Sequence, residues 1–212
     1  LLICALGSFV LVSAGAENRG AATRLPVGEI GKQRYYTPAN QILTPLGVQV
    51  ELPGMRPQAL ALSPDGRLLV TAGKTPELVV IDPVSGAIRQ RVALPSEKEN
   101  EPRDAAVSEH ILAPDKEGQL SFTGLVFSPD GSRIFLANVN GSIKVFAVDS
   151  GGQVRGLFSM RLPPARARER LEDIPAGLAV SSDGKKLYVV LNLSNRLAEL
   201  DAATGKLLRS WN

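Results

Sequence analysis

Apolar and polar positions alternate in short runs along most of this chain, and the runs come in groups of four. The first group lies between about Arg56 and Pro95, with glycine, proline and aspartate between its runs. The runs cover 58–62, 67–72, 77–82 and 87–94. Runs of this length are typical of β-strands, and their close spacing favours antiparallel hairpins. The sequence therefore predicts an all-β fold.

The turn between the first two runs recurs along the chain. Its three copies are Ser63-Pro64-Asp65-Gly66, Ser128-Pro129-Asp130-Gly131 and Ser181-Ser182-Asp183-Gly184. They define repeats at about 56–95, 121–163 and 174–212. A sheet of four short strands cannot bury both faces alone, and radial packing of such sheets gives a β-propeller. We expect the aspartates to stabilise these turns rather than to bind calcium, because each turn supplies only one carboxylate.

The third repeat has the most specific pattern. Pro175 to Val190, followed by Leu200-Asp201 and Thr204-Gly205-Lys206, resembles the YVTN-type β-propeller repeat. The resemblance implies a ring of about seven blades, closed by an N-terminal strand, in proteins that bacteria often export. We expect Val48–Leu52 to be that closing strand. Three blades and one strand cannot close a ring, so we expect this propeller to be incomplete and the chain to be part of a longer protein.

The N-terminal residues differ from the rest of the chain. Leu1 to Val12 is almost entirely apolar and precedes Ser13-Ala14-Gly15-Ala16, a pattern typical of a signal peptide cut after Ala16. The apolar run is shorter than the ~20 residues that span a bilayer. We therefore predict a truncated signal peptide at 1–16, an extended leader with little regular structure at 17–45 and a partial propeller at 46–212. The predicted location is the bacterial periplasm or exterior, with no stable membrane span after cleavage.

Composition narrows the classes of partner. The 24 Lys and Arg residues and 21 Asp and Glu residues are spread along the chain, and only 5% of residues are aromatic. Nucleic-acid binding proteins gather basic residues on one face and often use aromatic side chains for base stacking. We expect no nucleic-acid partner.

Two insertions interrupt the repeats, at 96–119 and 164–173. Each joins the last strand of one unit to the first strand of the next, so in a propeller both lie on the rim that carries the turns between second and third strands. Loops on such a rim commonly hold binding sites. The candidate binding residues are Arg166, Arg168, Arg170, Asn138, Asn140, Asn192, Asn195 and His110.

Each candidate also has a simpler interpretation. His110 has no second histidine beside it, and metal sites need three or four donors, so a surface role is favoured. The three arginines could bind an anion or an acidic partner, although most charge runs are only solvated. Asn140-Gly141-Ser142 and Asn192-Leu193-Ser194 match the N-glycosylation pattern but are also ordinary turn sequences. The sequence predicts no cofactor and no metal ion.

The leading functional hypothesis is an exported binding or scaffold module that engages a protein, glycan or other cell-envelope ligand through the loop-bearing rim. The alternative, drawn from the family resemblance, is a propeller that positions substrate for a metal-dependent phosphoesterase whose catalytic domain is missing from this chain. A propeller lactonase is a weaker third possibility. The sequence contains no catalytic constellation, so it leaves the question of enzymatic activity open.

Overall fold

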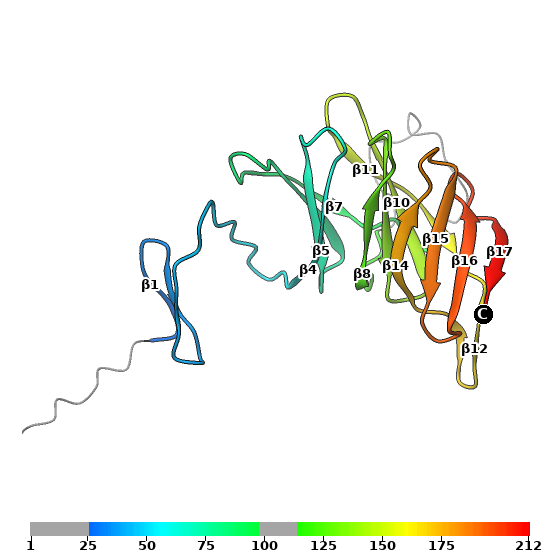
Figure 1. The fold of residues 1–212 in the computed structure, drawn as a ribbon, viewed down its shortest axis with the longest axis horizontal. Helices are drawn as coiled ribbons and strands as arrows, with labels where there is room; N and C mark the ends of the chain where they lie inside the picture. The colour runs from blue at the N-terminus through cyan, green and yellow to red at the C-terminus, as the bar shows by residue number, and fades with distance from the viewer. Residues whose placement is uncertain (1–25, 98–113) are drawn as a thin grey trace, which may run out of the picture. The chain divides into compact units, whose positions relative to one another are not determined.

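A computed structural model describes residues 26–97 and 114–212 (Figure 1). The chain divides into two compact units between Gly47 and Val48. The first contains a three-stranded antiparallel sheet of β1 (Gly28–Gly31), β2 (Arg34–Tyr36) and β3 (Ile42–Leu43). The prediction of little regular structure in the leader is therefore wrong for these residues. The strands of this sheet are joined by turns that contain Gln33 and Asn40. Both residues adopt positive φ, a conformation typical of turns.

The second unit contains three four-stranded antiparallel sheets, each with its strands in chain order. Blade 1 is β4 (Pro57–Leu62), β5 (Leu69–Gly73), β6 (Glu77–Ile81) and β7 (Ile88–Ala93). Blade 2 is β8 (Leu120–Phe127), β9 (Arg133–Asn138), β10 (Ser142–Val148) and β11 (Val154–Arg161). Blade 3 is β14 (Pro175–Val180), β15 (Lys186–Leu191), β16 (Arg196–Asp201) and β17 (Leu207–Trp211). A hairpin of β12 (Pro164–Ala167) and β13 (Arg170–Glu172) lies between blades 2 and 3.

The repeated turn folds identically in all three blades. In blade 2 the Ser128 hydroxyl donates to Asp130 Oδ1 at 2.6 Å and accepts from the Arg133 backbone N–H at 2.9 Å. Gly131 adopts a φ of 73°, which glycine tolerates because it has no Cβ. The same bonds join Ser63 to Asp65 and Ser181 to Asp183. The expected structural role of these aspartates is confirmed.

The blades pack face to face, and the first strand of blade 2, β8, contacts the first strands of both neighbours, β4 and β14. One apolar core joins blades 1 and 2 through residues such as Val70 and Ile134. Another joins blades 2 and 3 through residues such as Phe135 and Val189. Blade 2 is thus covered on both faces, and the predicted β-propeller architecture is confirmed. The described residues contain no helix, and so none that could cross a membrane.

The predicted closing strand at Val48–Leu52 is not a strand. The segment has no regular secondary structure and pairs with no strand in the described part of the chain. Val50 and Leu52 instead pack against Met55, which precedes β4, and against Val79 and Ile81 of β6. A segment becomes part of a sheet only when a neighbouring strand supplies hydrogen bonds, and none of the described strands pairs with this one.

Candidate functional site

We define the insertion rim as the edge of the propeller that carries both insertions and the turns between second and third strands. Hydrogen bonds show that these pieces lie together. The Val139 N–H donates to the Gln119 carbonyl at 3.0 Å, and Asn140 Nδ2 donates to the Glu117 carbonyl at 3.3 Å. Arg170 Nη2 donates to the Val139 carbonyl at 3.2 Å. The expectation that insertions and turns share one rim is confirmed.

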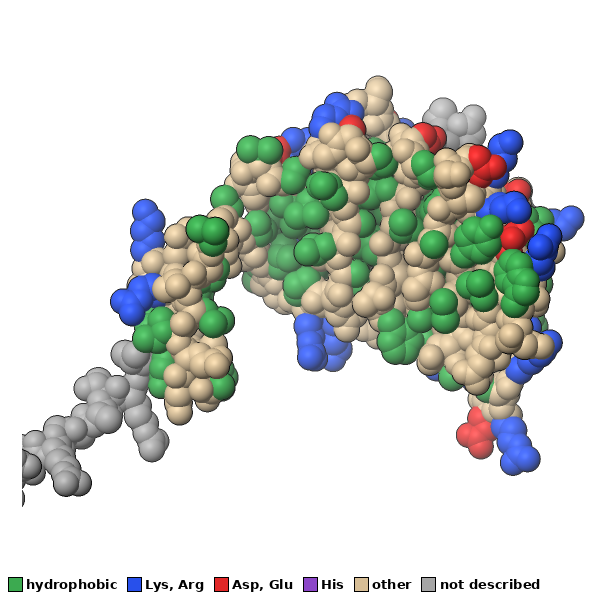
Figure 2. Space-filling model, viewed as in Figure 1, with side chains coloured by type: hydrophobic (Ala, Val, Ile, Leu, Met, Phe, Trp, Pro, Cys, Tyr) green, Lys and Arg blue, Asp and Glu red, His purple; other side chains and the backbone are tan. Residues whose placement is uncertain are grey.

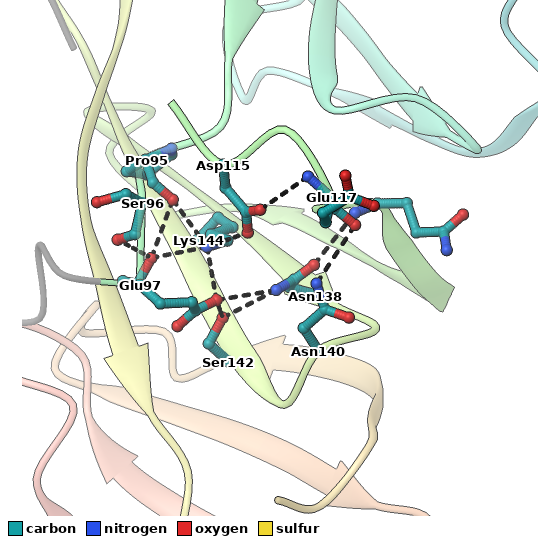
Figure 3. A network of polar contacts seen from close by, with 11 residues as sticks. Pro95, Ser96, Glu97, Asp115, Glu117, Asn138, Asn140, Ser142 and Lys144 are labelled. Atoms are coloured by element: carbon teal, nitrogen blue, oxygen red, sulfur yellow. Dashed lines mark hydrogen bonds and ion pairs between the residues drawn. The ribbon is translucent and has the colours of Figure 1, made fainter. Parts of the chain in front are cut away.

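A buried lysine holds the two described ends of the first insertion (Figure 3). Lys144 on β10 is fully buried, and its Nζ lies 2.7 Å from the Pro95 carbonyl and 2.7 Å from Glu97 Oε1. It also lies 3.0 Å from Ser159 Oγ and 2.9 Å from Asp115 Oδ2. Since a buried ammonium is costly without partners, these oxygens explain why a lysine is tolerated here. The lysine therefore joins the chain before the insertion to the chain after it.

Further polar side chains complete this group, which we call the stem cluster: Glu97, Asp115, Asn138, Ser142 and Lys144. Asn138 Nδ2 donates to Glu97 Oε1 at 3.0 Å, and Ser142 Oγ donates to the same oxygen at 2.5 Å. Asn138 Oδ1 accepts from the Gln119 N–H at 3.1 Å. Asn138 is fully buried and bonds to Glu97 and Gln119, so a role for it in binding another molecule stays a prediction. Its amide groups are used to shape the insertion stem.

The second insertion forms the hairpin β12–β13, which is fixed at its base. Asp173 Oδ1 accepts from the Leu193 N–H at 3.0 Å, and Arg196 Nη2 donates to the Pro164 carbonyl at 3.0 Å. The Arg166 N–H donates to Ser194 Oγ at 2.8 Å. These bonds tie the hairpin to blade 3, while its tip projects from the rim (Figure 1). The tip is an exposed surface, and Leu171 on β13 is 82% exposed.

The three predicted arginines are all exposed on this hairpin but have different surroundings. Arg166 Nη1 donates to Asn212 Oδ1 at 3.0 Å, and Arg170 reaches the Val139 carbonyl. Arg168 lies at the tip beside Glu169. Two of the three guanidinium groups therefore already bond to the protein, and binding of an anion by the arginines stays a prediction.

The other predicted residues lie at turns. Asn140 and Asn192 are exposed on the insertion rim, and Asn195 adopts a φ of 49° in the turn between β15 and β16. Asparagine is among the residues that tolerate this conformation best, so a turn role accounts for Asn195. His110 lies outside the described residues.

Phe122 is a feature of the rim that the sequence did not reveal. It lies in β8 where the pairing with β9 is interrupted between Leu120 and Leu125. Its φ is 54° and it is 52% exposed. A bulky residue rarely adopts positive φ, and side chains held so are concentrated at functional sites. Counting back six residues from the serine of each turn gives Pro57, Phe122 and Pro175, so aligning the repeats could have flagged this position.

The opposite rim carries the aspartate turns, and its charged side chains pair with one another. A cavity of about 570 Å³ lies there between blades 1 and 2, lined by Asp65, Arg67, Asp82, Arg89 and Asp130 among others. Its arginines already pair with its aspartates: Arg67 Nε lies 2.6 Å from Asp65, and Arg89 bonds to Asp82. Hydrogen bonds from Ser63 and from the Arg67 N–H hold the pKa of Asp65 below its usual range. These carboxylates therefore stabilise the turns in which they lie.

Within the two described ranges, no group of three or more His, Cys, Asp or Glu residues could hold a metal ion. The Lys144 ammonium is fully buried and surrounded by oxygens of Pro95, Glu97 and Ser159.

No protein-family model and no curated protein matches this sequence. Solved structures are similar in fold. A chain of Kuenenia stuttgartiensis hydrazine synthase is 19% identical with a TM-score of 0.51, covering 78% of this chain and 37% of that one. The RRP9 WD40 repeats are 14% identical with a TM-score of 0.55, covering 76% and 40%. U3-55K is 12% identical with a TM-score of 0.54, covering 76% and 41%.

This chain therefore spans about two fifths of the length of these structures. At such low identity the likeness concerns the fold, and it agrees with a β-propeller of repeated four-stranded blades.

Proposed function

We propose that this protein is a β-propeller scaffold that binds another protein through the insertion rim. The observation that carries the proposal is Phe122, an exposed aromatic side chain held at positive φ on that rim. Aromatic residues dominate the binding energy of many protein interfaces, and exposed aromatic groups on rigid scaffolds lose little entropy on binding. The WD40 propellers that share this fold make a scaffold role reasonable by analogy.

The rest of the rim supports the same proposal. The stem cluster fixes both described ends of the first insertion, and the bonds at Asp173 and Arg196 fix the hairpin. Leu171 adds a second exposed apolar side chain on the same rim. A rigid rim with apolar contacts among exposed polar side chains has the composition of a protein interface.

Two finer parts of the proposal come from the sequence. The signal-like N-terminus supports export, so we expect the partner in the bacterial periplasm or outside the cell. The resemblance to YVTN-type repeats depends on the repeat residues alone, and membership of that family stays a prediction. The phosphoesterase alternative depends on that resemblance alone, and no observation in the described residues favours it over protein binding.

Site-specific photo-crosslinking tests the proposal. A crosslinking residue placed at position 122 or 171 is expected to capture the same protein from extracts of the source cells. Placed at position 67, on the opposite rim, it is expected to capture none of it. Excess unlabelled protein should compete, whereas excess Phe122→Gly should compete about tenfold less well, because glycine keeps the backbone at positive φ and removes the aromatic ring. Equal capture from position 67, or full competition by Phe122→Gly, contradicts the proposal.

A further inference from the structure

Three donors of blade 2 converge on one carboxylate oxygen in the stem cluster (Figure 3). Asn138 Nδ2 lies 3.0 Å and Lys144 Nζ 2.7 Å from Glu97 Oε1. Ser142 Oγ lies 2.5 Å from the same oxygen. Asn138 ends β9, Ser142 begins β10 opposite it, and Lys144 follows on β10. All three donors are buried, and the pairing of two inner strands fixes their positions.

These buried donors need an acceptor between them. The Ser142 hydroxyl donates its single hydrogen to Glu97 Oε1, and Asn138 Nδ2 donates one of its two hydrogens to the same atom. Without an acceptor at this point, both groups would lose that partner in a place that water hardly reaches, which costs free energy. A carboxylate accepts such bonds more strongly than a neutral oxygen does. The position therefore favours an anionic oxygen.

The Lys144 charge does not need Glu97 for its compensation. Asp115 Oδ2 lies 2.9 Å from the ammonium nitrogen, and the Asp115 side chain is only 10% exposed. An ammonium group has three hydrogens, whereas four oxygens lie within 3.0 Å of this one, those of Pro95, Glu97, Asp115 and Ser159. One acceptor is therefore in excess. Of the two carboxylates, Glu97 is the more accessible, with a side chain that is 43% exposed.

The stem of the first insertion also has bonds that do not involve the Glu97 side chain. The Asp115 N–H donates to the Leu94 carbonyl at 2.9 Å, and Pro95 forms a β-bridge with Pro114. Lys144 Nζ donates to the Pro95 carbonyl at 2.7 Å. The Glu97 side chain can therefore leave its position while the stem stays closed.

We propose that Asn138, Ser142 and Lys144 form a carboxylate-binding site, which Glu97 fills from within the chain and which accepts the carboxylate of another molecule in exchange for Glu97. The incoming carboxylate would accept the same three hydrogen bonds. The proposal concerns these donors alone and holds whether or not the insertion rim binds a protein.

The arginines of the β12–β13 hairpin suit a carboxylate less well. All three are exposed, and two of them already bond to the protein. Figure 2 shows acidic and basic side chains together at the tip of the hairpin, where water and neighbouring charges compete with a ligand. The stem donors are buried, and hydrogen bonds to a carboxylate are stronger in such surroundings.

Chemical rescue tests the site. Glu97→Ala removes the internal carboxylate and leaves the three donors in place. Added acetate is expected to shift the side-chain amide resonances of Asn138 saturably and to raise the melting temperature of this variant. Acetamide, which has a similar shape but no charge, should bind at least about tenfold more weakly. Glu77→Ala is the matched control, because it removes a carboxylate that pairs with Arg91 near the surface, and acetate should not raise its melting temperature.

A titration of the unaltered chain tests the exchange, and it does not require Glu97→Ala to fold. Acetate must here displace the tethered Glu97, so the same Asn138 resonances should shift with a Kd about tenfold or more above that of the variant. N-acetylglycine and N-acetylglutamate amide distinguish the source of the carboxylate, because one offers a chain terminus and the other a side chain, and the tighter probe identifies the preferred group. The proposal is overturned if acetamide acts like acetate, if Glu77→Ala responds as Glu97→Ala does, or if acetate leaves the Asn138 resonances of the unaltered chain unchanged.

Discussion

Asp130 shows how a few hydrogen bonds fix each turn of this protein. Its Oδ1 accepts from Ser128 Oγ and from the Ser132 N–H, and its Oδ2 accepts from Ser132 Oγ. The Ser128 hydroxyl, the Ser132 groups and the turn backbone stabilise the ionised carboxylate and so lower the pKa of Asp130. The repeated serine is therefore as important to the turn as the aspartate, because it bonds both the carboxylate and the chain beyond it.

Replacing this serine should destabilise the protein. Ser128→Ala leaves the partly buried Arg133 N–H without its partner at 2.9 Å and removes a bond to Asp130. We expect a loss of about 1–2 kcal/mol in the free energy of unfolding, measured by urea denaturation. Ser150→Ala, at an exposed turn position, is the matched control and should have little effect. An unchanged urea midpoint for Ser128→Ala would contradict this account of the turn.

The lowered aspartate pKa values also predict the response to acid. Hydrogen bonds lower the pKa of Asp65, Asp82, Asp130, Asp183 and Asp201. A carboxyl with a lower pKa in the folded state contributes stability above its unfolded pKa, and this contribution is lost as pH falls through the folded pKa. The melting temperature should be nearly constant from neutral pH to about 5 and should fall steadily below about 4. Asp130→Asn should melt lower at pH 7 and lose less on acidification; an equal loss would refute the link.

Close contact between neighbouring blades depends on a glycine in the first strand. A Cβ at Gly124 of β8 would lie 2.1 Å from the Ala176 carbonyl oxygen and 2.4 Å from Ala137 Cβ. Gly177 of β14 occupies the corresponding position of blade 3, and a Cβ there would meet nothing within 4 Å. The same position in the repeat is therefore crowded in one blade and open in the next.

These two glycines provide a matched pair of variants. Gly124→Ala should reduce the free energy of unfolding by about 2–3 kcal/mol, because the first strands of blades 2 and 3 must move apart. Gly177→Ala should change it by less than about 0.5 kcal/mol. Chemical denaturation of both variants measures the difference. Similar values for the two would show that the contact between β8 and β14 does not limit stability.

The strands and turns could be predicted from the sequence because their signals are local. Alternation of apolar residues and the Ser-x-Asp-Gly turn predicted β4 to β7 within about two residues at each end. The segment Val48–Leu52 has the same local pattern, but it forms no strand, because strand formation also needs a pairing partner that a local pattern does not provide. Phe122 and Lys144 were missed because their importance depends on bulge geometry and burial, which only the packed blades determine.

Blade 2 lies between the other two blades. This position should make the hydrogen bonds of its inner strands the last to open. All of β9 except Arg133 is buried, as is all of β10 except Val148. Blades 1 and 3 each cover one of its faces, so opening of blade 2 requires both neighbours to separate. In repeat proteins, stability is approximately the sum of each unit and its contacts with its neighbours. Amide exchange should therefore be slowest in β9 and β10.

The side chain of Gln90 joins blade 1 to blade 2 at their outer strands. Its loss should change amide exchange in blade 1 but not in blade 3. Gln90 Nε2 donates to Gln153 Oε1 at 2.8 Å, and its Oε1 accepts from the Val154 N–H at 2.8 Å. Gln90→Ala should weaken this contact by about 1 kcal/mol. Exchange in β5 and β6 should then become about fivefold faster, while β15 and β16 keep their rates, because the contacts of blade 3 are untouched. Gln58→Ala, at an exposed position, serves as the control. Equal acceleration in blades 1 and 3 would show that the propeller opens as one cooperative unit rather than blade by blade.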